Sequence, residues 1–207
     1  MSGTFGKVGN AVNLSDLRNS NTLGIIKKDF NSITMENEMK PDAFLGYSPT
    51  LISTSEAKSR GYIIPDGYAE STVPELNFSN IDEVLKIASQ NGLSVRFHTM
   101  VWHQQTPKYF FQQNYKITTG QKYNTSKECM DTRLEFYVKT VMNHVLSSEY
   151  ADCLYSYDVV NEYLHSANAE KDSKNITYWG LIYGTYDKSV KDHGVTLRPS
   201  YVKDAFK

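Results

Sequence analysis

The sequence YSYDVVNE at Tyr155–Glu162 joins a strand-like run to two polar residues. Its first six residues are mainly aromatic or β-branched, which predicts a β-strand over Tyr155–Val160. The strand ends directly in Asn161 and Glu162. A carboxylic acid in that position must be paired, solvated or functional.

The same arrangement occurs twice earlier in the chain. Phe30–Thr34 is a predicted strand that precedes a polar cluster at residues 36–40, and Leu93–Phe97 is another that runs into His98. Helical patterns separate the strands, so the chain is predicted to be α/β with a parallel sheet, either open or closed into a barrel. In both arrangements, residues that follow the strands lie on the ligand-binding face.

The predicted helices have recognisable ends. Ser79 is a predicted N-cap for a helix that ends before Gly92, and Ser126 is a predicted N-cap for a longer helix. Apolar residues after Asn13 predict an earlier helix, although Gly24 weakens that pattern.

The sequence predicts a single domain over residues 1–207, without repeats or a linker. Leu45–Pro74 has weak periodicity and several prolines and glycines, so we expect a long loop on the functional face. Pro199–Lys207 has the pattern of a starting helix without a C-cap, which suggests a piece of something longer.

Composition narrows the function classes. The net charge of -1 predicts no nucleic-acid partner, and no apolar run is long enough for a membrane helix. The N-terminus lacks the pattern of a signal peptide. Cys129 and Cys153 are expected to be free thiols rather than a disulfide. Four Asn-x-Ser/Thr sequons would matter only in a eukaryotic secretory pathway: Asn13, Asn77, Asn124 and Asn175.

Polar residues that could carry chemistry gather after the three predicted strands. They supply one candidate acid, several amide and cationic donors, and an indole, without a phosphate-binding glycine loop or a nucleophile elbow. Glycosidic hydrolysis requires an acid for the leaving oxygen, a second carboxylate opposite it, and groups that bind hydroxyls. The candidates are Glu36, Asn37 and Lys40, then His98, Trp102, His103 and Gln105, then Asn161 and Glu162.

Three segments give a more specific resemblance. Phe30–Lys40, His98–Pro107 and Tyr157–Glu162 resemble the motifs after the second, third and fourth strands of glycoside hydrolase family 10, in the right order. The resemblance runs from about Phe5 to the C-terminus, with Leu45–Pro74 longer and more divergent. It implies a (β/α)8 TIM barrel, of which this chain supplies roughly the first four β/α units, and an endo-1,4-β-xylanase without a cofactor.

The resemblance also implies roles for individual residues. Glu162 would be the general acid and then the base, and Asn161 would bind the 2-hydroxyl of the sugar beside the cut. Lys40, His98 and Trp102 would line that subsite. Glu36, Asn37 and Gln105 would bind the next xylose outward, and His103 and Asp158 would orient their neighbours.

Ordinary alternatives exist for several of these residues. Glu36 and Lys40 are four residues apart and would form a helix-surface pair if the motif were absent. His98 is a candidate for a hydrogen-bonded core histidine, and Trp102 for a cap on the core. His98 and His103 have no third ligand nearby, and no EF-hand spacing is present, so neither zinc nor calcium is predicted.

The sequence departs from the family pattern at a few positions. Phe97 stands where the family usually has glycine, which predicts crowding near His98. Pro41 stands where an aromatic is common, and Tyr157 replaces a common tryptophan. Nothing after Glu162 resembles the nucleophile motif.

Glu170 is the only later glutamate, and it lies in a polar stretch. We therefore expect the nucleophile to lie outside this chain. Because half a barrel has open edges, we also expect a second polypeptide that carries the C-terminal half. The expected partner molecules are xylan or xylo-oligosaccharide, and the expected location is extracellular. The alternatives are a non-catalytic xylan-binding half-barrel and an α/β protein that binds another ligand.

Overall fold

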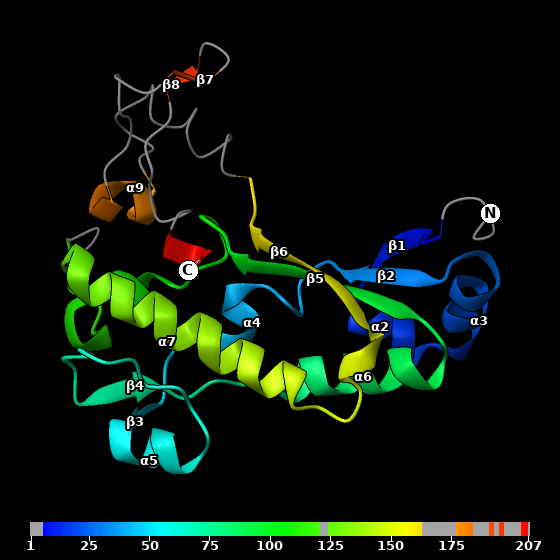
Figure 1. The fold of residues 1–207 in the computed structure, drawn as a ribbon, viewed down its shortest axis with the longest axis horizontal. Helices are drawn as coiled ribbons and strands as arrows, with labels where there is room; N and C mark the ends of the chain where they lie inside the picture. Colours follow the sequence, from blue (N-terminus) through cyan, green and yellow to red (C-terminus); the bar gives the residue numbers. More distant parts are fainter. Residues whose placement is uncertain are drawn as a thin grey trace.

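The computed structural model describes residues 6–120, 124–162, 177–183, 191–192, 195–196 and 204–206. Its centre is a parallel sheet in the order β1-β2-β5-β6, which confirms the predicted α/β class (Figure 1). The strands are β1 (Gly9–Val12), β2 (Ser32–Met35), β5 (Ser94–Val101) and β6 (Leu154–Val160).

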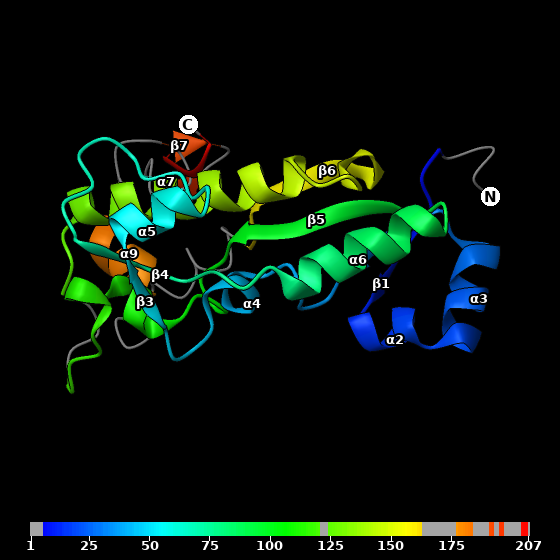
Figure 2. The same cartoon turned by 90° about the horizontal axis from the view of Figure 1, so that it is seen from below.

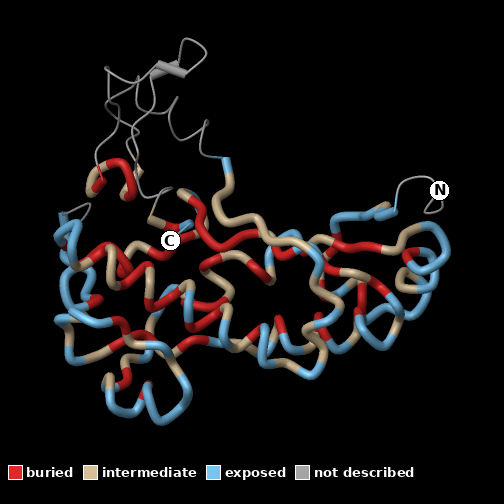
Figure 3. Tube along the Cα trace, viewed as in Figure 1, coloured by how far each residue is buried: buried red, intermediate tan, exposed pale blue. Residues whose placement is uncertain are grey.

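The two faces of this sheet have opposite chemistry. Ile33 and Met35 of β2, with Val95 and Phe97 of β5, are fully buried. Successive residues of a strand point to opposite faces, so the residues between these buried ones, such as Arg96, lie on the other face. Helices cover the apolar face, as Figures 1 and 2 show. Along the chain, β2 and β5 are largely buried, whereas β6 is only half-buried (Figure 3).

The helices on the apolar face differ in two details from the sequence prediction. The segment after Asn13 forms two helices rather than one, because Asn19 ends the first and caps the second with its side chain. Ser79 lies inside its helix, and the side chain of Asn77 accepts the hydrogen bond from the Ser79 backbone N–H. The helices are α2 (Leu14–Arg18), α3 (Ser20–Asp29), α6 (Ser79–Gln90) and α7 (Lys127–Leu146).

Two predicted helix ends are confirmed. Gly92 follows α6 with a φ of 68°, a conformation that glycine adopts without steric cost. The side chain of Ser126 accepts a hydrogen bond from the Cys129 N–H at the start of α7.

The prediction of a long loop over Leu45–Pro74 is wrong in part. The segment contains a two-stranded antiparallel ribbon and a short helix, and it packs against α7 through the Ile63 N–H and the Thr140 hydroxyl, 3.0 Å apart. Only three residues of each strand pair, which is too short for periodicity to reveal. The elements are β3 (Leu51–Ser53), α5 (Thr54–Ser59) and β4 (Thr72–Pro74), preceded by α4 (Pro41–Leu45).

Phe97 does not crowd His98, contrary to expectation. Its ring points to the helix-covered face and stacks on Phe44 and Tyr157 at centroid distances of 6.0 and 5.9 Å. Successive strand residues face opposite ways, so extra bulk at Phe97 enlarges the core and leaves His98 open. Pro41 occupies the first turn of α4, where a missing N–H costs nothing.

The remaining described elements all follow β5 in the chain, and some of their side chains, such as Phe110 and Trp179, belong to the buried core. They are the short 3₁₀ helices Lys108–Phe111, Gln113–Tyr115 and Ala151–Cys153, then α9 (Tyr178–Tyr183) and the ribbon β7 (Lys191–Asp192) and β8 (Val195–Thr196). Within the described part of the chain, no helix has the length and apolar composition needed to cross a bilayer. The predicted helix at Pro199–Lys207 lies mostly outside the described residues, although Asp204 and Ala205 are helical.

Cys129 and Cys153 are both free and half-buried, as predicted. Burial raises the pKa of the Cys129 thiol, and it raises that of Cys153 to about 11. Both thiols are therefore protonated at neutral pH and have little nucleophilic character.

Candidate active site

The three predicted polar clusters meet at one end of the sheet. Because β2, β5 and β6 run parallel, the residues that follow them lie at the same, carboxyl, edge. The predicted grouping of Glu36, Trp102 and Glu162 near this edge is therefore consistent with the topology. His98 is placed differently from the prediction, since β5 continues through it to Val101.

Glu162 is held by the indole of Trp102, whose Nε1–H donates to Glu162 Oε2 at 2.9 Å. Its backbone has a φ of 52°, in the left-handed region that non-glycine residues rarely enter. Such strain costs about 1–3 kcal/mol and is concentrated at functional sites. The side chain is exposed at the end of β6, where a ligand can reach it.

Trp102 is itself fixed from behind. The carbonyl oxygen of Trp102 accepts hydrogen bonds from the Thr106 hydroxyl at 2.5 Å and from the Trp179 indole at 3.3 Å. The ammonium of Lys40 lies 4.7 Å from the centroid of the Trp102 ring, a cation–π distance. Lys40, Trp102 and Glu162 thus form one contiguous group.

His98 and Asp158 form a second group on the polar face of the sheet. They are paired across β5 and β6, and His98 Nδ1 lies 2.7 Å from Asp158 Oδ2. The other carboxylate oxygen, Oδ1, accepts from the Arg96 guanidinium at 2.9 Å. Asp158 therefore orients the His98 ring. The family resemblance implies this role for Asp158.

The third group is a chain of side-chain hydrogen bonds. Asn13 Nδ2 donates to Glu36 Oε2 at 2.6 Å, and Asn37 Nδ2 donates to Asn13 Oδ1 at 3.0 Å. Gln105 Nε2 lies 3.4 Å from Asn37 Oδ1 and 3.3 Å from Asp42 Oδ2. Glu36, Asn37 and Gln105, predicted to act together, are therefore connected, although they come from two different strand ends.

The chain of side-chain hydrogen bonds also includes Asn13 and Asp42, which the sequence did not mark as candidate site residues. Asn13 was noted only as a sequon, yet it bridges Glu36 and Asn37. The signal was present, because Asn13 follows β1 as Glu36 follows β2, but the β1 sequence GNAV has a single β-branched residue and no aromatic residue to mark it as a strand. Asp42 was missed because it lies in α4 rather than directly after a strand.

Asn161 and His103 lie beside these groups. The Asn161 N–H donates to the Val101 carbonyl at 2.9 Å, which continues the β5–β6 pairing up to Glu162. The His103 ring contacts Trp102 edge-on, with 5.9 Å between centroids. Seven of the eight predicted site residues therefore lie at, or directly beyond, the carboxyl edge, and the eighth, His98, lies within β5 on the polar face of the sheet.

The helix-surface pair of Glu36 and Lys40 is wrong. Residues 36–40 form turns rather than a helix, and α4 begins only at Pro41. Glu36 bonds Asn13 instead, whereas Lys40 lies over Trp102. Among the residues the structure describes, no three His, Cys, Asp or Glu side chains are grouped to hold a metal ion.

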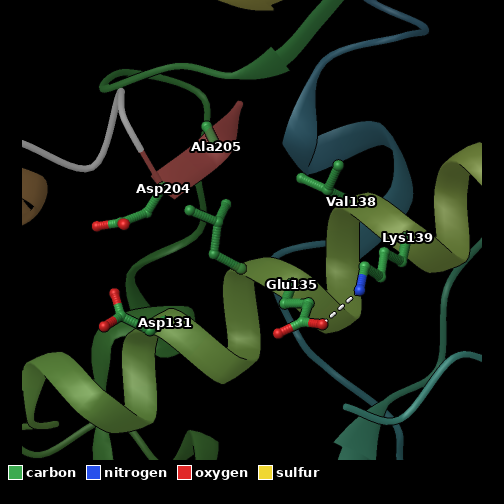
Figure 4. Close-up of a pocket in the computed structure, with 7 residues that line it drawn as sticks. Asp131, Glu135, Val138, Lys139, Asp204 and Ala205 are labelled. Carbon is green, nitrogen blue, oxygen red and sulfur yellow. Dashed lines mark hydrogen bonds and ion pairs between the residues drawn. The ribbon is translucent and has the colours of Figure 1, made fainter. Parts of the chain in front are cut away.

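A separate hollow of about 240 Å³ lies along α7 (Figure 4). Asp131, Glu135 and Lys139 from α7 line it, together with Asp204 and Ala205. Glu135 and Lys139 form an ion pair across one helical turn at 2.5 Å. None of the eight predicted site residues borders this hollow, so its position does not suggest a role in the same chemistry.

Comparisons with known proteins agree with this geometry. The family model described as Glycosyl hydrolase family 10 matches residues 1–189. The chain is 45% identical to endo-1,4-beta-xylanase A of Butyrivibrio fibrisolvens over 203 residues, covering 98% of this chain and 44% of that protein. It is 34% identical to endo-1,4-beta-xylanase Y of Acetivibrio thermocellus, over 87% of this chain and 14% of that protein.

Solved structures give the same result. The N-terminal endo-1,4-beta-D-xylanase 10B of Clostridium thermocellum, complexed with xylohexaose, has a TM-score of 0.66 at 30% identity, covering 97% of this chain and 34% of that chain. The endo-1,4-beta-xylanase of Caldicellulosiruptor owensensis has a TM-score of 0.58 at 29% identity, covering 97% and 45%. The chain thus spans less than half the length of the curated relatives cited here.

Proposed function

Since this chain belongs to glycosyl hydrolase family 10, we propose that it carries the acid/base part of a retaining endo-1,4-β-xylanase. The observation that carries this proposal is the position of Glu162. It lies at the carboxyl end of a parallel strand, in a strained conformation, against Trp102. The fold is part of a (β/α)8 barrel, and the described sheet supplies four of its strands.

Glu162 acts twice in the proposed reaction. Its protonated carboxyl first gives a proton to the glycosidic oxygen as the bond to C1 breaks, while a second carboxylate attacks C1 from the opposite face. The resulting carboxylate of Glu162 then takes a proton from water, which attacks C1 and releases the enzyme. The configuration at C1 inverts twice and is retained.

The neighbouring residues bind and position the sugar in this proposal. Asn161 binds the 2-hydroxyl of the xylose beside the cut, and Lys40, His98 and Trp102 line the same subsite. Support comes from the Lys40–Trp102–Glu162 contacts and from the fixed His98 ring.

The next xylose outward is bound by Glu36, Asn37 and Gln105 in this proposal. Asn13 connects Glu36 to Asn37, and Gln105 donates to Asn37, so the three side chains present a pre-organised set of donors and acceptors. Pre-organisation lowers the cost of ordering side chains on binding.

The nucleophile is proposed to lie outside these 207 residues. A retaining enzyme places its two carboxyl groups about 5–5.5 Å apart. The only glutamate after Glu162 is Glu170, which lies outside the described residues and in a sequence unlike the nucleophile motif.

The activity is tested with xylan. We expect the protein that contains this chain, with its barrel complete, to release xylo-oligosaccharides whose new reducing ends are initially all β, as proton NMR would record. Because a polymer does not cross membranes, we propose an extracellular location and expect this activity in culture medium rather than in lysate. Release of α ends would contradict retention, and absence of turnover would contradict the xylanase proposal.

We further propose that a second polypeptide completes the barrel. In the described sheet β1 and β6 are edge strands, and Arg96 on the polar face is half exposed. Exposed edges and an uncovered interior face favour association. Sedimentation of the natively purified protein should give a species larger than 23.6 kDa, with a second chain in its mass spectrum. A stable monomer of 23.6 kDa would exclude this partner.

A further inference from the structure

Tyr47 extends the third group of side chains beyond the residues proposed to bind sugar. Its hydroxyl donates to Asp42 Oδ2 at 2.6 Å, and the same oxygen lies 3.3 Å from Gln105 Nε2. Glu36, Asn13, Asn37, Gln105, Asp42 and Tyr47 therefore form one continuous hydrogen-bonded chain along the edge of the site. Tyr47 is its outermost member.

The ring of Tyr47 is exposed although its support is rigid. Tyr47 is 67% exposed, whereas Phe44 and Leu45, which precede it across Gly46, are buried in the core. The Leu45 carbonyl accepts a hydrogen bond from the buried Tyr109 hydroxyl at 2.6 Å, and the Gly46 N–H donates to the Asp42 carbonyl at 2.8 Å. The start of the 45–74 segment is therefore anchored directly before Tyr47, whose side chain projects into solvent.

Asp42 connects this ring to the site in two ways. Its backbone N–H donates to the Gln105 carbonyl at 2.9 Å, so α4 and the segment after β5 are joined by main-chain and side-chain bonds. The hydrogen bond to the Asp42 carboxylate raises the pKa of the Tyr47 phenol, so the phenol remains a donor at neutral pH.

The surface on both sides of Asp42 is hollowed. A hollow of about 260 Å³ is lined by Asn37, Asp42 and Gln105, and a second of about 470 Å³ is lined by Asp42, Gly46 and Ser48. They share Asp42 and Ala43, so hollowed surface continues from the Asn37–Gln105 pair to the residues on either side of Tyr47 in the sequence.

A pyranose presents an apolar face suited to a tyrosine ring and hydroxyls suited to a carboxylate. A single exposed tyrosine is ordinary on a protein surface. Here the ring is fixed through its hydroxyl to a residue that also contacts the proposed outer subsite. This arrangement fits one further sugar residue of a chain that already occupies that subsite.

We propose that Tyr47, oriented by Asp42, is the stacking platform of an additional xylose-binding subsite, one residue beyond that of Glu36, Asn37 and Gln105. This inference rests on the proposed function. A bound chain has its first xylose beside Glu162, its second at Asn37 and Gln105, and its third on Tyr47. The subsite therefore distinguishes substrates with three sugar residues on that side of the cut from those with two.

The test uses the protein with its barrel complete and two substrates, an aryl β-xylobioside and an aryl β-xylotrioside. We expect Tyr47→Ala to lower kcat/KM for the xylotrioside by roughly 5- to 10-fold, the size of an aromatic contact, and to leave that for the xylobioside unchanged. Tyr47→Phe keeps the ring but loses the bond to Asp42, so its loss on the xylotrioside should be smaller.

Tyr155→Ala is the matched control, because Tyr155 is an exposed tyrosine that pairs with Ser32 near the opposite, amino, end of the sheet. It should not change the ratio between the two substrates. An unchanged ratio in Tyr47→Ala, with both substrates cleaved, would overturn this inference and leave the proposed function intact. Cleavage of neither substrate by the unmodified protein would overturn both.

Discussion

Replacing Glu162 with glutamine should lower kcat on xylan by about 10²- to 10⁴-fold, the usual contribution of general acid–base catalysis. Glutamine has the size of glutamate but cannot donate a proton to the leaving oxygen or take one from water. Its amide oxygen can still accept the hydrogen bond from Trp102 Nε1, so the local structure should persist. Binding of xylo-oligosaccharides, measured by calorimetry, should therefore be largely unchanged.

Glu135→Gln is the matched control for this change. Glu135 lies on α7, where it pairs with Lys139 in the hollow of Figure 4, and it is not among the residues proposed to act on or bind the sugar. We expect xylan turnover to be unaffected by it. If turnover survives Glu162→Gln as well, Glu162 is not the acid. If the unmodified protein binds xylan without hydrolysing it, the chain is part of a non-catalytic binding module.

Replacing Arg133 with alanine should lower the free energy of unfolding by about 3–5 kcal/mol, the cost of leaving a buried charge without its partner. The Arg133 side chain has no exposed surface, and it makes a two-point contact with Glu70 at 2.5 and 2.6 Å. It also donates to the Phe110 carbonyl at 2.6 Å and stacks on the Tyr115 ring at 3.9 Å. Urea denaturation followed by circular dichroism measures the loss.

Arg18→Ala is the matched control for Arg133. Arg18 makes the same two-point contact with Glu83, at 2.6 and 2.8 Å, but its side chain is 57% exposed. Water screens an exposed pair, so we expect only a small change in the free energy of unfolding. Equal losses in the two variants would show that burial does not set the strength of the Arg133–Glu70 pair.

Arg133 also matters for the position of the 45–74 segment. Glu70 belongs to that segment, and Glu70 Oε1 further accepts the Asn114 N–H at 3.0 Å. The pair therefore fastens the segment to α7 and to the residues after β5. Tyr47 lies at the other end of the same segment, where Tyr109 holds the Leu45 carbonyl.

Much of the site followed from short-range sequence pattern. Strands such as Tyr155–Val160 are read from local side-chain type, and parallel strands place the residues after them at one edge. Glu36, Trp102 and Glu162 were assigned to that edge for this reason, and the structure agrees. The helix ends at Gly92 and Ser126 were equally local, since one backbone conformation or one side-chain bond defines each.

The sequence by itself determined the α/β class and the identity of the residues at the strand ends. The tertiary structure alone decided which of them touch, because those contacts join residues far apart in the chain. Three such contacts depend on how α2, α4 and the strand ends pack: Asn13 with Glu36, Asp42 with Gln105, and Tyr47 with Asp42.

Phe97 also shows what the sequence alone could not decide. A phenylalanine in place of the family's usual glycine predicted crowding at His98, but the strand directs the Phe97 ring into the core. Local pattern fixes which face a side chain takes, and only packing fixes what it meets there.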